Sequence, residues 1–106
     1  MTRRAKLMHW AALVRSAERQ LGLYHALEYM TPWQRRETMI GRDNCTALGL
    51  AASDPAFQAQ GLNERSSIED GLRFFDLTLT QTHAFSCDCG GAISNAEQAT
   101  RIERLV

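Results

Sequence analysis

Helix-start signals recur at short intervals along the whole chain. Each has a side chain that can accept hydrogen bonds from the free amides of a first helical turn. Either a proline at the first helical position or an acid or amide three residues later completes the signal. Thr31-Pro32 with Gln34 combines all of these features, and Asp54-Pro55 supplies a cap and a proline. Because so many starts fall within 106 residues, the sequence predicts short helices joined by tight loops.

Apolar spacing predicts a long first helix. From Thr2, its expected cap, to about Leu21, apolar residues recur at intervals of three and four, which is the period of one helix face. Gly22 weakens the helix at that point, so a second segment over 23–30 is expected to continue it after a bend. The apolar positions predicted to be buried on the first helix are Leu7, Trp10, Ala11, Val14, Ala17 and Leu21.

Two further short helices, and then a short turn that opens with a similar start signal, are predicted in the middle of the chain. Their expected caps are Thr31, Asp43 and Asp54. Their expected ranges are 32–41, 44–52 and 55–61, followed by a loop over 63–67. The first helix and the short turn are each expected to end at a glycine, since a residue without a side chain readily adopts the backbone conformation that follows a helix.

Two more capping boxes predict the remaining helices. Ser66 with Glu69 predicts a helix that begins one residue after the serine. Ser94 with Glu97 predicts a last helix over 95–105, after a turn in the glycine-containing segment that precedes it. This last helix is expected to bury Ala96, Ala99 and Ile102, with Leu105 and Val106 as further candidates.

Residues 74–85 carry two periods at once. Phe75, Leu77 and Leu79 continue a helical spacing, but they also alternate with polar residues, which is the period of a strand. A lone strand would leave its backbone hydrogen-bonding groups unpaired, and the chain contains no second convincing strand. The helix is therefore expected to continue through about Thr80. A single strand around 74–85, paired with its own copy in a dimer, is the alternative.

Composition supports one small domain over residues 1–106. A hydrophobic fraction of 44% is ordinary for a folded protein and argues against general disorder. No apolar run approaches the roughly 20 residues that a membrane span needs, and none resembles a signal peptide. Three cysteines, an odd number, favour a reducing compartment, so we expect a cytoplasmic protein without a membrane partner. The fold predicted is an all-α, compact bundle of five or six short helices.

Charge is divided unevenly between the two halves of the chain. Residues 1–42 contain eight basic and three acidic residues, whereas 43–106 contain four basic and nine acidic residues, and the total is zero. Eleven of the twelve basic residues are arginine, which is typical of a GC-rich bacterial genome. A basic half can bind phosphates, although the two halves can equally neutralise each other. The candidate nucleic-acid-binding residues are Arg3, Arg4, Lys6, Arg15, Arg35, Arg36 and Arg42.

A cluster of cysteine and histidine is the most distinctive local motif. His83, Cys87 and Cys89 fall within seven residues and are followed by two glycines, and thiolates with imidazole are the ligands that zinc prefers. Cys45 is the candidate fourth ligand, from a distant part of the chain. One residue between the paired cysteines is fewer than common zinc motifs have, so ordinary buried or turn cysteines are the competing interpretation.

Catalytic signatures are absent from the sequence. It contains no Gly-x-Ser-x-Gly elbow, no phosphate-binding loop and no His-Glu-x-x-His helix. Acid pairs occur at helix starts, where they favour the helix dipole without any catalytic role. We therefore expect a protein that is not an enzyme.

Large apolar and aromatic side chains crowd the first 40 residues. They exceed what one helix face can bury, and aromatic residues with methionine and arginine are enriched at the centres of protein interfaces. The residues expected at such an interface are Trp10, Tyr24, Tyr29 and Trp33. The sequence thus favours a binding or regulatory module that acts through a protein partner or a homodimer. Nucleic-acid binding by the arginine-rich half, with or without a structural zinc ion, is the alternative.

Overall fold

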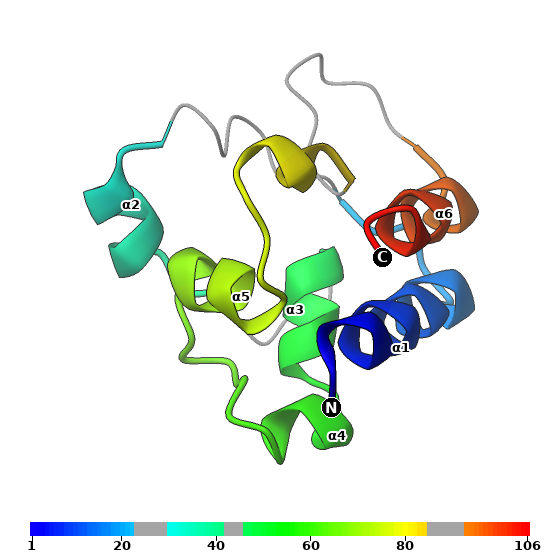
Figure 1. Cartoon of the computed structure of the whole chain (residues 1–106), viewed down its shortest axis with the longest axis horizontal. Coiled ribbons are helices and arrows are strands. Elements are labelled where there is room, and N and C mark those ends of the chain that lie inside the picture. Colours follow the sequence, from blue (N-terminus) through cyan, green and yellow to red (C-terminus); the bar gives the residue numbers. More distant parts are fainter. Residues whose placement is uncertain (23–29, 42–45, 85–92) are drawn as a thin grey trace.

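The computed structural model describes residues 1–22, 30–41, 46–84 and 93–106 (Figure 1). These residues form six α-helices and one 3₁₀ helix: α1 (Arg3–Ser16), α2 (Pro32–Glu37), α3 (Ala47–Ala52), α4 (Pro55–Gln58), α5 (Ile68–Phe74), the 3₁₀ helix (Thr80–Ala84) and α6 (Asn95–Glu103). Within them, extended pairing is limited to two isolated bridges, Gly22 with Thr46 and Met39 with Ser67. The predicted bundle of short helices is therefore confirmed.

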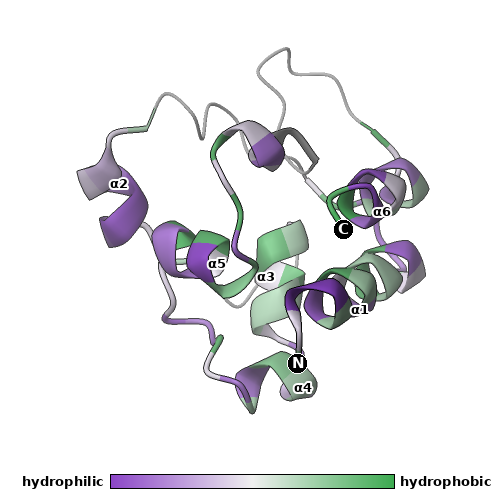
Figure 2. Cartoon of the chain, in the orientation of Figure 1, coloured by the Kyte–Doolittle hydropathy of each residue, from purple (hydrophilic) through white to green (hydrophobic). Residues whose placement is uncertain are grey.

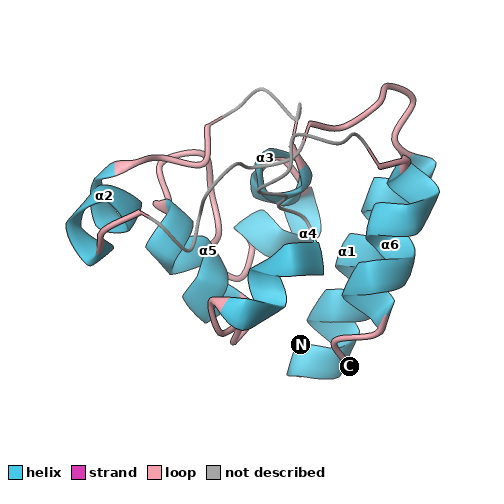
Figure 3. Cartoon of the chain, turned by 90° about the horizontal axis from the view of Figure 1, so that it is seen from above, coloured by secondary structure: helices cyan, strands magenta, loops and turns pink. Residues whose placement is uncertain are grey.

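The antiparallel pair α1 and α6 forms one side of the molecule (Figure 3). Arg3 Nη1 near the start of α1 donates to the carbonyl of Leu105 beyond the end of α6, at 2.9 Å. At the other end of the pair, the amide of Leu21 donates to the side chain of Asn95 at 2.9 Å. The radius of gyration of 12.3 Å agrees with the value of about 13 Å expected for a packed chain of this length.

Aromatic side chains fill the centre of the core. Trp10 stacks on Phe75 with 4.1 Å between ring centroids, and its Nε1 donates to the carbonyl of Ala47 at 2.9 Å. Phe57 meets Phe75 edge to face at 5.4 Å. These contacts join α1, α3 and α4 to the residue that follows α5. The predicted inward face of α1 is correct at Leu7, Trp10, Ala11 and Val14, all of which are buried.

Most of the predicted helix caps are confirmed. The hydroxyl of Thr2 accepts from the amide of Ala5, and Thr31 with Gln34 forms the complete reciprocal capping box. The carboxylate of Asp54 accepts from the amide of Phe57 at the start of α4. These caps satisfy amides that have no partner within their own helix.

Two predicted helix starts were wrong in position. The helix expected over 44–52 begins only at Ala47, with Thr46 as its cap, and the predicted cap Asp43 lies outside the described residues. The cap of α5 is Ser67 with Asp70, one residue later than predicted. The hydroxyl of Ser66 accepts instead from the amide of Asn63 in the preceding loop.

Two helices end earlier than their apolar or glycine signals predicted. α1 stops at Ser16, and Leu21 is buried beyond its end, while Ala17 is only half-buried. α2 stops at Glu37 because the chain then pairs with the segment before α5. The amide of Ile40 donates to the backbone carbonyl of Ser66 at 2.8 Å. The predicted continuation over 23–30 lies outside the described residues except for Met30.

The prediction of a helix to Thr80 was wrong, and so was the alternative of a strand around 74–85, as far as the described residues 74–84 show. Asp76 has a φ of 53°, which ends α5. The amide of Leu77 donates to the carbonyl of Leu72 at 2.8 Å, and the amide of Asp76 donates to the carbonyl of Arg73 at 3.0 Å. These two bonds define a Schellman motif, in which the left-handed residue is usually glycine. The turn redirects the chain before either predicted period can continue.

The last helix differs from its prediction in which residues it buries. Ala99 and Ile102 are buried as expected, but Ala96 is exposed, Val106 is exposed and Leu105 is half-buried. Gln98 is fully buried instead, and its side-chain amide donates to the carbonyl of Leu21 at 3.3 Å. None of the helices that the structure describes combines the length and the apolar character that a bilayer crossing requires.

Candidate interaction surface on α2

Helix α2 lies at the edge of the molecule, opposite the α1–α6 pair (Figures 1 and 3). All six of its residues are described, and Arg35 alone among them is buried. Figure 2 shows the contrast with the interior: α3 is coloured towards the hydrophobic end of the scale and α2 mostly towards the hydrophilic end. The one large apolar residue of α2, Trp33, is 63% exposed. The helix therefore contributes no apolar side chain to the core.

Polar contacts of Arg35 attach α2 to the rest of the chain. The side chain is 9% exposed, and its Nε donates to Oε2 of Glu69 on α5 at 3.2 Å. Its Nη1 donates to the backbone carbonyl of Met30, just before α2. A buried guanidinium needs such partners, since a buried charge without them is strongly destabilising. The side chain of Glu69 also lies 4.0 Å from Arg73.

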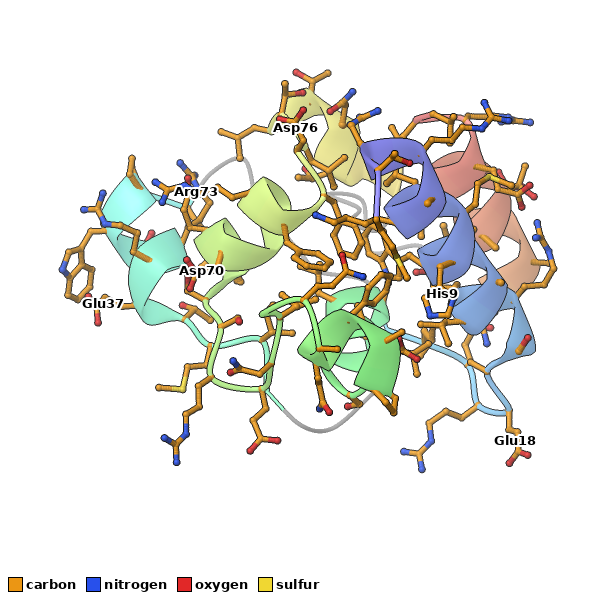
Figure 4. All side chains as sticks on the ribbon, turned by 60° about the horizontal axis from the view of Figure 1, so that its bottom comes forward. His9, Glu18, Glu37, Asp70, Arg73 and Asp76 are labelled. Atoms are coloured by element: carbon orange, nitrogen blue, oxygen red, sulfur yellow. The ribbon has the colours of Figure 1, made fainter. Side chains whose placement is uncertain are left out.

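The outward side of α2 consists of Trp33, Arg36 and Glu37, which we name the α2 face. Successive residues of an α-helix are about 100° apart, so Arg36 lies roughly 60° to one side of Trp33 and Glu37 roughly 40° to the other. By the same rule, the buried Arg35 lies on the opposite side of the helix. Figure 4 shows Glu37 at the outer edge of α2, away from the other helices.

Charges on the α2 face have no partner among the described residues. Arg36 and Glu37 are both exposed, and neither forms a hydrogen bond or ion pair within the part of the chain that the structure describes. Met39, two residues after the helix, is 64% exposed. The region thus combines one large aromatic, one methionine and one charge of each sign, all accessible to solvent.

The residues predicted from the sequence to lie at an interface have three different outcomes. Trp33 is exposed, as an interface residue of the free chain must be. The prediction for Trp10 was wrong, because this side chain is 0% exposed and packs within the core. Tyr24 and Tyr29 lie outside the described residues.

The candidate nucleic-acid-binding residues that the structure describes do not form one open basic surface. Four of them are engaged within the chain: Arg3 donates to the carbonyls of Asp76 and Leu105, Lys6 donates to that of Phe74, Arg15 pairs with Glu103, and Arg35 pairs with Glu69. Arg4 on α1 and Arg36 on α2 are exposed, and they belong to helices on opposite sides of the molecule. Arg42 lies outside the described residues.

The predicted zinc ligands cannot be placed. Cys45, Cys87 and Cys89 lie outside the described residues, and so does the side chain of His83. Among the residues that are described, no group of three or more histidine, cysteine or acidic side chains could hold a metal ion. Zinc binding therefore stays a prediction from the sequence.

A histidine–aspartate pair was missed in the sequence. Nε2 of His9 on α1 lies 2.9 Å from Oδ2 of Asp54, the oxygen that also caps α4. The imidazole meets the ring of Phe57 edge to face at 4.9 Å. The pair fastens α1 to the start of α4. Asp54 was recognisable as a cap, but nothing local indicates its second partner 45 residues away.

An open hollow of about 390 Å³ lies beside α5. Its walls include Arg65, Asp70 and Phe74. One cation and one anion on its walls do not define the charge of a ligand, and Asp70 already caps α5. The α2 face is therefore the stronger candidate for a functional surface.

Comparisons with protein-family models, curated proteins and solved structures found no match for this chain.

Proposed function

We propose that this chain is a protein-interaction module and that α2 carries its contact surface. The observation that supports this function best is the 63% exposure of Trp33 on a helix with no buried apolar residue. Packing against the residues that the structure describes does not account for a tryptophan at this position. Tryptophan is enriched among the few residues that dominate binding energy at protein interfaces.

The neighbouring residues suit the same role. Met39 adds a flexible apolar side chain, a type that is common at adaptable binding surfaces. Arg36 and Glu37 supply polar contacts at the rim of the aromatic residue, which is the usual arrangement of an interface. We place the module in the cytoplasm, on the basis of its odd number of cysteines. We propose binding rather than catalysis.

Nucleic-acid binding has weaker support. It needs several free cations on one side of the molecule, because phosphate neutralisation provides most of the affinity. The engaged Arg3, Lys6 and Arg15 leave few such cations on α1. On α2, a nucleic acid that reached Arg36 would bring phosphates close to Glu37.

Oxidative footprinting of the full chain tests the proposal. The chain is exposed to hydroxyl radicals alone and in an extract of cells that express it, and oxidation of each methionine and tryptophan is measured by mass spectrometry. We expect Met39 and Trp33 to be protected in the extract. Met8 on α1, which is 41% exposed, is the matched control, and oxidation of Met39 and Trp33 is measured relative to it because the extract itself consumes radicals. Reactivity of Met39 and Trp33 that stays the same in the dilute chain, in the concentrated chain and in the extract would overturn the proposal.

A further inference from the structure

We infer that the partner of the α2 face is a second copy of this chain, packed as a parallel pair of α2 helices around a twofold axis. This inference rests on the proposed function, since it uses the same surface. It specifies the occupant of that surface and the orientation in which it binds.

The positions of the two charges favour a second copy. Arg36 and Glu37 lie on opposite flanks of Trp33, and both lack partners within the described chain. A twofold interface brings each residue of one surface against a residue of the same surface on the other copy. A face with one unpaired cation on one flank and one unpaired anion on the other can therefore be complementary to itself.

Symmetry also decides the orientation. A twofold axis parallel to the helices exchanges the flanks, so that Arg36 of each copy faces Glu37 of the other, and the two Trp33 side chains meet near the axis. A twofold axis perpendicular to the helices keeps the flanks, so that Arg36 faces Arg36 and Glu37 faces Glu37. Opposite charges attract in the first arrangement and like charges repel in the second. The parallel pair is the arrangement that the sequence of the α2 face fits.

Net charge agrees with association between copies. The chain carries twelve basic and twelve acidic residues, so two copies do not repel each other at long range. The α2 face is small, because the helix has only six residues. Stable protein interfaces in general bury more than about 1,000 Å² in total. We therefore expect a weak, reversible dimer with a Kd on the order of 10–100 µM.

Sedimentation equilibrium of the purified full chain tests the inference, over concentrations on both sides of that range. We expect reversible dimerisation of the natural sequence. Arg36→Glu and Glu37→Arg should each weaken it by about tenfold or more, since each leaves two like charges facing each other on both flanks. The double variant R36E/E37R should restore it, because the same pairs form with their signs exchanged. An equimolar mixture of the two single variants should also associate.

Controls separate loss of the interface from loss of the fold. Arg4→Glu reverses the charge of an arginine on α1 that is also exposed, and it should leave the dimer unchanged. Each variant is checked by its thermal unfolding, which changes little at exposed positions. A chain that stays monomeric throughout the concentration range, or a double variant that does not recover, would overturn the inference.

The two proposals fail in different ways. If the purified chain is monomeric while Met39 and Trp33 are protected in the extract, the proposed function stands and its partner is another protein. If they are protected in neither the extract nor concentrated pure protein, both proposals are wrong. If the purified chain dimerises but its α2 variants dimerise equally well, the second copy binds elsewhere and the inference is wrong.

Discussion

Helix α1 buries Leu7, Trp10, Ala11 and Val14 among the described residues, whereas α2 buries Arg35 alone. Each helix carries one tryptophan. That of α1 stacks on Phe75 in the core, and that of α2 faces solvent. The two helices are therefore held by different forces. Apolar burial holds α1, and a small number of charge-assisted hydrogen bonds hold α2.

This difference predicts that the two helices open independently. A segment with few buried apolar contacts detaches at a lower free energy than the whole fold, in local opening reactions that hydrogen exchange detects. α2 should behave as such a segment, and α1 should open only when the whole chain unfolds. A surface on a weakly held helix can adjust to a partner without disturbing the core.

Replacement of the two tryptophans should give the largest contrast. Trp10→Ala removes a fully buried aromatic and should lower the free energy of unfolding by about 3–5 kcal/mol. Trp33→Ala should change it by less than about 0.5 kcal/mol, as exposed positions usually do. Urea unfolding monitored by far-ultraviolet circular dichroism measures both values. Similar losses in the two variants would mean that Trp33 packs against the chain, contrary to the structure.

Removal of the Arg35 attachment should release α2 without unfolding α1. Arg35→Ala leaves Glu69 without its closest partner, and we expect a loss of about 2 kcal/mol, moderated because Glu69 is partly exposed and lies near Arg73. Hydrogen exchange of the α2 amides should accelerate more than that of the α1 amides. Arg36→Ala is the matched control on the same helix and should alter neither. Equal acceleration in both helices would contradict the independent opening of α2.

The helix caps should show the same contrast on a smaller scale. Thr2→Ala and Thr31→Ala each remove a side-chain acceptor at a first turn, which costs about 1 kcal/mol of helix stability. In α1 this loss should appear in global unfolding, because the helix is part of the core. In α2 it should appear mainly as faster exchange at Gln34 and Arg35. A clear fall in the melting temperature of Thr31→Ala would show that α2 unfolds together with the core.

The turn after α5 should give the smallest change in the free energy of unfolding, and one substitution there should raise stability rather than lower it. Asp76 adopts a φ of 53°, and at the matching position after α4, Gly61 adopts 104°. Asp76→Gly should stabilise the fold by about 0.5–1 kcal/mol, whereas Gly61→Ala should destabilise it by a similar amount. Because α5 carries both core residues and Glu69, we expect the gain in global unfolding but not in the local opening of α2. Thermal unfolding and hydrogen exchange of the two variants check this.

The helix starts could be predicted from the sequence because capping is a local interaction. Thr31 and Gln34 meet within one turn, so their types and spacing suffice. Helix ends were less predictable. Glycine after a helix is a recognisable signal, but Asp76 in the same conformation is not, and the end of α2 depends on pairing with residues near Ser66. The serine that caps α5 was misjudged because two adjacent serines each had an acid three residues later.

The candidate surface could be predicted only in part. The sequence placed Trp10 on the apolar face of the first helix but proposed both Trp10 and Trp33 as interface residues, although only Trp33 is exposed. Their difference depends on which helices pack together, which is not a local property. The attachment of α2 joins Arg35 to Glu69 across 34 positions of the chain. Arg36 was selected for its charge, but its placement opposite Glu37 around Trp33 becomes meaningful only once the outward side of α2 is known.

The pairing of α1 with α6 has a consequence for the synthesis of this protein. α6 begins about 80 residues after α1 ends, so at about 5–20 residues per second a ribosome needs roughly 4–16 s to supply the second helix. During that interval the apolar face of α1 around Leu7, Trp10 and Val14 lacks the helix that later covers one side of it. The nascent chain therefore exposes an apolar surface on α1 early in synthesis. It completes its fold only after α6 has left the exit tunnel.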